Sequence, residues 1–167
     1  MKINKLDGKY VYQKTPHLSW SEISYGLERG FIDESAASVY ACERLGAGSS
    51  PEVIELASLT PEQLFSARSI LRYLSNNEEE QSTDFSRPWI FLLLSFAFEN
   101  RNLFDDPFEY IEELYVEFDY PENLAGAARY MPVPDGLQGS DEYLLNNWKK
   151  AICEYGNMLD QSPKKDE

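Results

Sequence analysis

The sequence predicts an all-α protein, an irregular multi-helix bundle or short α-solenoid, or α with one small N-terminal β-hairpin. Three observations predict this class. Polar helix caps recur with an acid or amide three residues later, glycine or asparagine follows the apolar runs, and period-2 alternation is never sustained after residue 16. The chain has 167 residues, 43% of them apolar, which is enough to bury a core. We expect one helical domain over residues 1–160 and a flexible tail at 161–167.

The N-terminal segment departs from the helical pattern. Asp7-Gly8 lies between apolar residues, and Asp-Gly suits a type I′ turn, so a small hairpin is expected there. The segment has lysines but no apolar stretch of the kind that marks a signal peptide. A cytoplasmic location is therefore expected.

Helix starts and stops follow from Ser19 onward. Ser19 and Glu22 have the spacing of a capping box, and proline follows the capping residue at Ser50, Thr60 and Asp106, a position where its missing N–H costs nothing. Glycine or asparagine then ends three helices, at Gly30, Gly46 and Asn76-Asn77. These signals predict helices over residues 20–29, 34–45, 51–58, 61–75, 87–100, 107–118, 122–129 and 141–158.

The most apolar run, Trp89 to Phe98, is ten residues long and is interrupted only by Ser95. A bilayer needs about 20 residues, so a buried central helix is expected instead. The two cysteines, Cys42 and Cys153, are far apart and form no CxxC motif. Two reduced, buried thiols are the expectation, and one structural disulfide is the alternative.

The net charge of −14 comes from 29 acidic and 15 basic residues. Phosphate backbones and anionic membranes both require a cationic surface, so neither nucleic acid nor membrane is expected as a partner. A protein partner that carries positive charge is compatible with this composition.

No catalytic or metal-binding pattern is recognisable. His17 is the sole histidine, and residues 46–50 precede a helix but lack the lysine and remaining glycines of a phosphate-binding loop. Asp105-Asp106 is followed by proline and lacks the spaced ligands of an EF-hand. We expect no enzyme, cofactor or metal; a deep pocket with two convergent carboxylates would revive the reading of a small enzyme.

One segment stands out from the background. Between Arg101 and Arg129 there is no lysine or arginine, and acids alternate with aromatics. At about 100° per residue, residues 107–119 place their apolar side chains in a stripe about 120° wide and their acids opposite, with Val116 the one apolar exception. Surface helices usually mix charge signs, because opposite i,i+4 pairs are stabilising and like pairs are not.

This acidic helix face has two readings. It is either a solvated surface that only keeps the protein soluble or a patch directed at a cationic partner. Tyr110 is expected at the boundary between the apolar and acidic faces, where a tyrosine can anchor a partner. The candidate partner-binding residues are Asp105, Asp106, Glu109, Tyr110, Glu112, Glu113, Glu117 and Asp119.

Several short motifs resemble an uncharacterised family of small acidic bacterial proteins over roughly residues 18–132. The motifs are Trp20-x4-Tyr25-Gly26, Pro88-Trp89, Asp106-Pro107 followed by Glu112-Glu113-Leu114-Tyr115, Phe118-Asp119-Tyr120-Pro121 and Tyr130-Met131-Pro132. The resemblance implies a bacterial, cytoplasmic protein and carries no catalytic residues. Similar small acidic proteins often act as immunity proteins that neutralise a toxin.

The sequence therefore supports two hypotheses. The first is a stoichiometric inhibitor, an immunity protein whose acidic helix face covers a cationic toxin domain. The second is an intracellular helical adaptor that binds a peptide or helix in an apolar groove near the 131–136 loop. The adaptor would show an exposed apolar patch and binding that hardly changes with salt.

Overall fold

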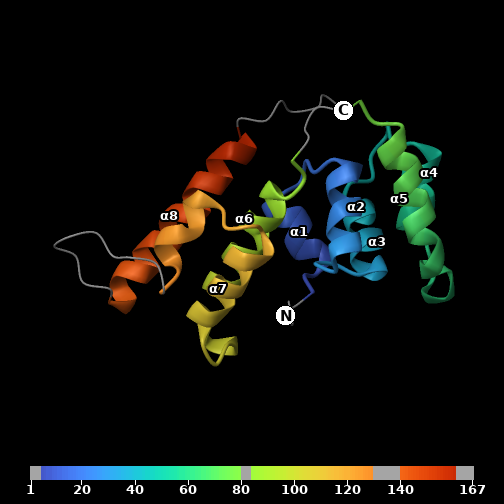
Figure 1. Cartoon of the computed structure of the whole chain (residues 1–167). Coiled ribbons are helices and arrows are strands. Elements are labelled where there is room, and N and C mark those ends of the chain that lie inside the picture. Colours follow the sequence, from blue (N-terminus) through green and yellow to red (C-terminus); the bar gives the residue numbers. More distant parts are fainter. Residues whose placement is uncertain (1–4, 80–83, 130–139, 161–167) are drawn as a thin grey trace. The chain divides into compact units, whose positions relative to one another are not determined.

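The computed structural model describes residues 5–79, 84–129 and 140–160, and every regular element of these residues is a helix. The predicted all-α class is therefore confirmed. Figure 1 shows the elements in chain order: α1 (Gly8–Lys14), α2 (Trp20–Arg29), α3 (Glu34–Glu43), α4 (Pro51–Ala57), the 3-10 helix η1 (Pro61–Ser66), α5 (Ala67–Asn76), α6 (Arg87–Glu99), η2 (Arg101–Leu103), α7 (Pro107–Glu117), η3 (Glu122–Ala127) and α8 (Asp141–Asp160).

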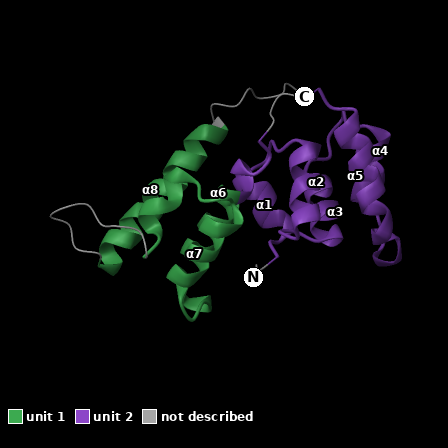
Figure 2. Cartoon of the chain, viewed as in Figure 1, with its two compact units in different colours: residues 1, 90–162 green, residues 2–89, 163–167 purple. Residues whose placement is uncertain are grey.

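The chain forms two compact units, which Figure 2 colours separately. Unit 2 (residues 2–89) holds α1 to α5, and unit 1 (residues 90–162) holds most of α6 together with α7 and α8. The boundary falls inside α6, after Trp89. The single domain expected over residues 1–160 stays a prediction. The tail expected at 161–167 lies outside the described residues.

The expected N-terminal hairpin is wrong, because these residues form α1. The Asp7 side chain accepts a hydrogen bond from the N–H of Lys9 at 2.8 Å, so it acts as a helix N-cap. Gly8 packs against α3, where a Cβ would overlap the carbonyl oxygen of Ala36. Asp7 therefore caps the helix and Gly8 allows its close contact with α3. The dipeptide Asp-Gly is also typical of a type I′ turn, so the sequence of these two residues does not distinguish the two structures.

Local capping sets most of the other helix limits as predicted. Ser19 and Glu22 form the capping box, with the Glu22 N–H 3.1 Å from Ser19 Oγ and the Ser19 N–H 2.9 Å from Glu22 Oε1. Gly30 ends α2 in the left-handed region at φ 81°. Two predicted α-helical stretches differ: Pro61–Ser66 and Glu122–Ala127 are 3-10 helices, a form common in short connecting turns. α3 also ends at Glu43, before Gly46.

Trp89 is the centre of the unit 2 core. Its side chain is fully buried, and its Nε1–H donates a hydrogen bond to the carbonyl of Glu22 at 2.8 Å. Its indole ring lies directly on Gly26 of α2, where any Cβ would overlap it. The Phe31 ring packs beside it, with centroids 5.8 Å apart. The absence of a side chain at Gly26 therefore creates the space that the indole fills.

Two polar contacts join elements of unit 2 that are distant in sequence. The buried Tyr40 hydroxyl donates to the Thr15 carbonyl at 2.7 Å and accepts from the Leu18 N–H at 3.0 Å, and burial raises the pKa of Tyr40. The Glu78 carboxylate, after α5, accepts from the N–H groups of Trp20 and Ser21 at 2.9 and 2.8 Å. A carboxylate at this position satisfies orphan donors at the positive end of α2.

Unit 1 is organised around Trp148 of α8. The indole is fully buried, and its Nε1–H donates to the Leu94 carbonyl of α6 at 3.1 Å. The Phe98 ring of α6 meets it edge to face at 5.3 Å, and the Phe108 ring of α7 lies 6.2 Å away. One aromatic side chain therefore holds three helices of this unit together.

Cys42 and Cys153 are free thiols that are exposed, so the expectation that they are buried is wrong. Both lie on helix faces turned away from the core, and the Cys42 Sγ is 2.9 Å from the carbonyl of Ala57. No helix in the described residues combines the length and apolarity that crossing a membrane requires.

Replacing Gly26 with alanine tests the contact with Trp89. Overpacking of this kind lowers the free energy of unfolding by about 1–3 kcal/mol. We expect urea denaturation to show a decrease of this size or larger for Gly26→Ala. Gly48→Ala is the matched control, because nothing lies within 4 Å of a Cβ there. Equal stability of the two variants would contradict this account of the unit 2 core.

Candidate functional site

The acidic segment singled out from the sequence is helical, as predicted. The Asp106 side chain caps α7 by accepting hydrogen bonds from the N–H groups of Phe108 and Glu109 at 3.2 and 3.3 Å. Pro107 occupies the first helical position, which suits its fixed φ. The acid and the proline together therefore determine where this helix begins.

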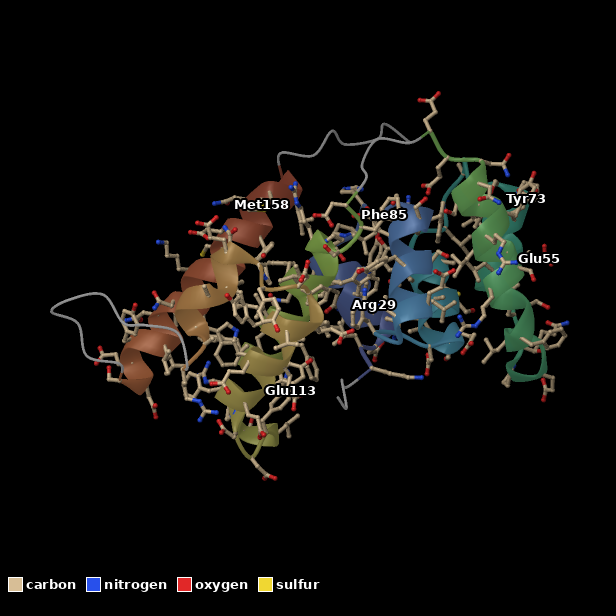
Figure 3. The ribbon with its side chains drawn as sticks, viewed as in Figure 1. Arg29, Glu55, Tyr73, Phe85, Glu113 and Met158 are labelled. Carbon is tan, nitrogen blue, oxygen red and sulfur yellow. The ribbon has the colours of Figure 1, made fainter. Side chains whose placement is uncertain are left out.

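α7 is amphipathic in the predicted sense. Ile111 and Leu114 are fully buried, whereas Glu109 is exposed. Val116, the predicted apolar exception on the acidic side, is 53% exposed. Figure 3 labels Glu113 on this helix. We call the solvent-facing side of α7 and its flanking turns the α7 outer face.

Two of the candidate acids on this face are already paired within the chain. The guanidinium of Arg129 contacts Glu112, with Nε 2.8 Å from Oε1 and Nη2 3.3 Å from Oε2, and its Nη1 lies 2.9 Å from Asp106 Oδ2. The Arg129 backbone N–H also donates to Glu112 Oε1 at 3.2 Å. Asp106 and Glu112 therefore hold an internal arginine, contrary to the expectation that they are open to a partner.

This cluster changes the proton affinity of its members. Partial desolvation raises the pKa of Asp106, but the hydrogen bonds from the Glu109 N–H and from Arg129 outweigh it and bring the pKa below its ordinary value of 3.8. The hydrogen bond to Glu112 is the largest influence on Arg129 and raises the pKa of its guanidinium. Both shifts favour the charged forms of Asp106 and Arg129 at neutral pH.

The expectation that Tyr110 is presented at the edge of the acidic face is wrong. The residue is only 5% exposed, and its ring packs on Phe104 with centroids 4.8 Å apart. Its hydroxyl has no hydrogen-bond partner in the described part of the chain. Burial, with a smaller contribution from the Glu113 carboxylate, raises the pKa of Tyr110. Phe104, which lies before the helix, covers the ring.

Four candidate acids remain open on the α7 outer face. Asp105, Glu109 and Asp119 are exposed and Glu113 is half-buried, and no ion pair within residues 5–79, 84–129 and 140–160 involves any of them. Glu117 is half-buried and makes a further interaction. We call Asp105, Glu109, Glu113 and Asp119 the open acids.

Exposed apolar side chains lie among these acids, and the sequence-based candidate set omits them. Val116 and Tyr120 are both more than half exposed, and Leu103 in η2 is 67% exposed. Such side chains lose contact with water when a partner covers them, which favours binding. For Val116 the sequence did contain a signal, because it is the one apolar residue on an otherwise acidic helix face.

α7 ends in a Schellman motif built without glycine. The Tyr120 N–H donates to the Tyr115 carbonyl at 2.7 Å and the Asp119 N–H to the Val116 carbonyl at 3.1 Å, the hydrogen-bond pattern of this motif. Asp119 and Tyr120 have φ angles of 60° and 57°, a left-handed conformation that L-residues other than glycine rarely adopt. The Tyr115 and Tyr120 rings meet edge to face at 5.2 Å and complete the motif.

The charge of the protein is concentrated in unit 1. Residues 90–160 contain fourteen acids and four bases, whereas residues 2–89 contain thirteen acids and nine bases. Three of the four unit 1 cations contact side chains outside α7. Arg101 and Lys149 lie over the Phe98 ring at 4.1 and 5.7 Å, and Lys150 is 3.9 Å from Glu154. The described residues hold no group of three or more His, Cys, Asp or Glu side chains arranged to bind a metal.

The fold and this surface define a small all-helical protein with a strongly acidic helix face. The chain belongs to the bacterial family described as "uncharacterized protein conserved in bacteria" (DUF2247), which matches residues 10–154. The resemblance inferred from the short motifs is thereby confirmed, and the match extends beyond residues 18–132 at both ends. No curated protein and no solved structure matches the chain.

Asp106→Asn tests the ionic contribution of the Arg129 cluster, since asparagine is also a good N-cap. The lowered pKa of Asp106 means that its ionised form stabilises the fold above pH 3.8 and that this contribution is lost as the pH falls further. We expect wild type to exceed the variant in unfolding free energy at neutral pH, and the difference to disappear in acid. A pH-independent difference would contradict an ionic role.

Asp119→Gly tests the left-handed end of α7. Glycine adopts this conformation without a Cβ penalty, so we expect a gain of about 0.5–1 kcal/mol in unfolding free energy by urea denaturation. Asp105→Gly removes the same charge at a residue without positive φ, where glycine should reduce stability. If Asp119→Gly is the less stable of the two variants, the assigned backbone strain is wrong.

Proposed function

We propose that this protein is a stoichiometric binding protein, a bacterial immunity protein that neutralises a cationic toxin through the α7 outer face. The observation that carries the proposal is the group of open acids, which form no ion pair in the described residues and share the α7 outer face with exposed Val116 and Tyr120. Acidic and apolar groups side by side offer a partner both long-range attraction and short-range contact.

The charge distribution supports this partner chemistry. A toxin that acts on nucleic acid carries a cationic surface for phosphates, and an acidic helix presents charges of the sign that this surface binds. The net negative charge of residues 90–160 accelerates encounter with such a surface at low salt, and screening over about 8 Å at physiological ionic strength reduces the effect. The proposed inhibitor acts in the cytoplasm of the cell that makes it and uses no cofactor or catalytic residue.

One observation favours a second function, that of a helical adaptor. Unit 2 exposes several large apolar side chains: Leu45, Ile54, Phe65 and Tyr73. Phe65 in η1 is 80% exposed, and Figure 3 labels Tyr73 on α5. A partner helix or peptide could bury these side chains, and such binding would depend little on salt. The groove expected near residues 131–136 lies outside the described residues.

The proposal is tested by measuring affinity for the toxin encoded beside this gene. Reversing the open acids Asp105, Glu109 and Glu113 to lysine should weaken binding about tenfold or more and flatten its salt dependence, because charged groups at the interface set both quantities. Glu52, Glu55 and Glu62 of unit 2, reversed together, form the matched control with the same change in net charge.

Two results would contradict the proposal. Equal weakening by the two triple variants would show that only total charge matters. Binding that is insensitive to salt, unaffected by the α7 triple variant and lost on Phe65→Ser would instead favour the adaptor.

A further inference from the structure

The N-terminal part of the chain is basic, in contrast to the rest of the sequence. Residues 2–16 contain four lysines and one acid, Asp7, and no further lysine occurs before Lys149. Residues 17–89 contain five bases and twelve acids. The carboxylate of Asp7 faces the first turn of α1, where it accepts a hydrogen bond from the Lys9 N–H. α1 therefore presents positive charge on a protein whose net charge is −14.

One side of α1 carries this charge and faces solvent. Gly8 and Val11 are buried, and Gly8 packs on α3. The exposed side chains lie on the opposite side of the helix or just before it, and they are Lys5, Lys9, Gln13 and Lys14, together with the half-buried Tyr10. We call these five residues the α1 basic face. Lys5 and Lys9 form no ion pair in the part of the chain that the structure describes.

The α1 basic face complements the α7 outer face in charge and in spacing. Glu109 and Glu113 are one turn apart, about 6 Å along the helix axis, and Lys9 and Lys14 are about 7.5 Å apart along theirs, at 1.5 Å per residue. These two glutamates also form no ion pair in the described residues. The apolar stems of lysine side chains can cover exposed Val116 while their ammonium groups reach the acids beside it.

We propose that the α1 basic face of one copy docks on the α7 outer face of a second copy of this chain. The inference goes beyond the proposed function, because it requires no toxin. The two faces differ, so each contact leaves one free face of either kind, and assembly can continue past a dimer or close into a ring. Contact through a seven-residue helix buries less than the ~1,200 Å² of a stable interface, so the association is weak and reversible. A cationic partner competes with the second copy for the same acids.

Salt acts on this contact in two ways. The net charge of −14 repels a second copy, but screening over about 8 Å at physiological ionic strength reduces this long-range repulsion. Charges that meet directly are closer than this distance, so their attraction is reduced less. At ~1 M salt the screening length is about 3 Å, and the contact itself should dissociate. Association through apolar surface alone would persist at this salt concentration.

The test is sedimentation velocity of the full chain over a concentration series at physiological ionic strength. Wild type should self-associate reversibly, and Lys5→Gln/Lys9→Gln and Asp105→Asn/Glu109→Gln/Glu113→Gln should each weaken association about tenfold or more. An equimolar mixture of the two variants should form a one-to-one complex, because each supplies the face that the other lacks. The controls are Arg68→Gln/Arg72→Gln and Glu52→Gln/Glu55→Gln/Glu62→Gln, which make the same changes in net charge elsewhere in unit 2.

Labelled wild type gives a readout that needs no variant. On dilution of ¹⁵N-labelled protein, the backbone amide resonances of α1 and α7 should shift and those of α4 should not. A protein that stays monomeric at every concentration, or a mixture of the two variants that forms no complex, overturns the inference. Toxin binding without self-association would refute this inference alone, and self-association without toxin binding would refute the proposed function alone.

Discussion

The α7 outer face depends on the burial of the opposite side of the same helix. Ile111 and Leu114 are fully buried, and burying a side chain of this size contributes about 1.5–3 kcal/mol. The like-charge i,i+4 pairs Glu109–Glu113 and Glu113–Glu117 each cost only about 0.2–0.5 kcal/mol. Packing therefore determines the orientation of α7, and its outer face can carry one sign of charge without loss of the helix.

The motifs that carry the family resemblance are mainly architectural. Gly26 and Trp89 belong to separate motifs, and they meet in the core of unit 2. The run from Tyr115 to Pro121 forms the end of α7, where paired tyrosine rings and two left-handed residues terminate the helix. In the described part of the chain, these motif residues therefore contribute to the packing of unit 2 and to the end of α7.

Local signals predicted the helices, and long-range contacts account for the errors. Ser19 and Asp106 cap within a few residues of themselves, so sequence spacing is sufficient to identify them. Arg129 reaches Glu112 across 17 residues, and helical periodicity contains no information about that pairing. Tyr110 lies at the boundary of the apolar stripe, and its burial is decided by Phe104, which belongs to no helix. For the same reason, the sequence around Asp7-Gly8 did not predict α1, because the role of Gly8 depends on its contact with α3.

The acids of α7 divide into those that serve the fold and those that do not. Asp106 caps the helix and Glu112 holds Arg129, so both have a structural reason to be acidic. Glu109 and Glu113 form no ion pair in the described residues and repel each other along one ridge. Solubility alone would be met equally well by alternating signs, which would also remove the repulsion. The proposed cationic partner would account for carboxylates that reduce helix stability and lie beside exposed Val116 and Tyr120.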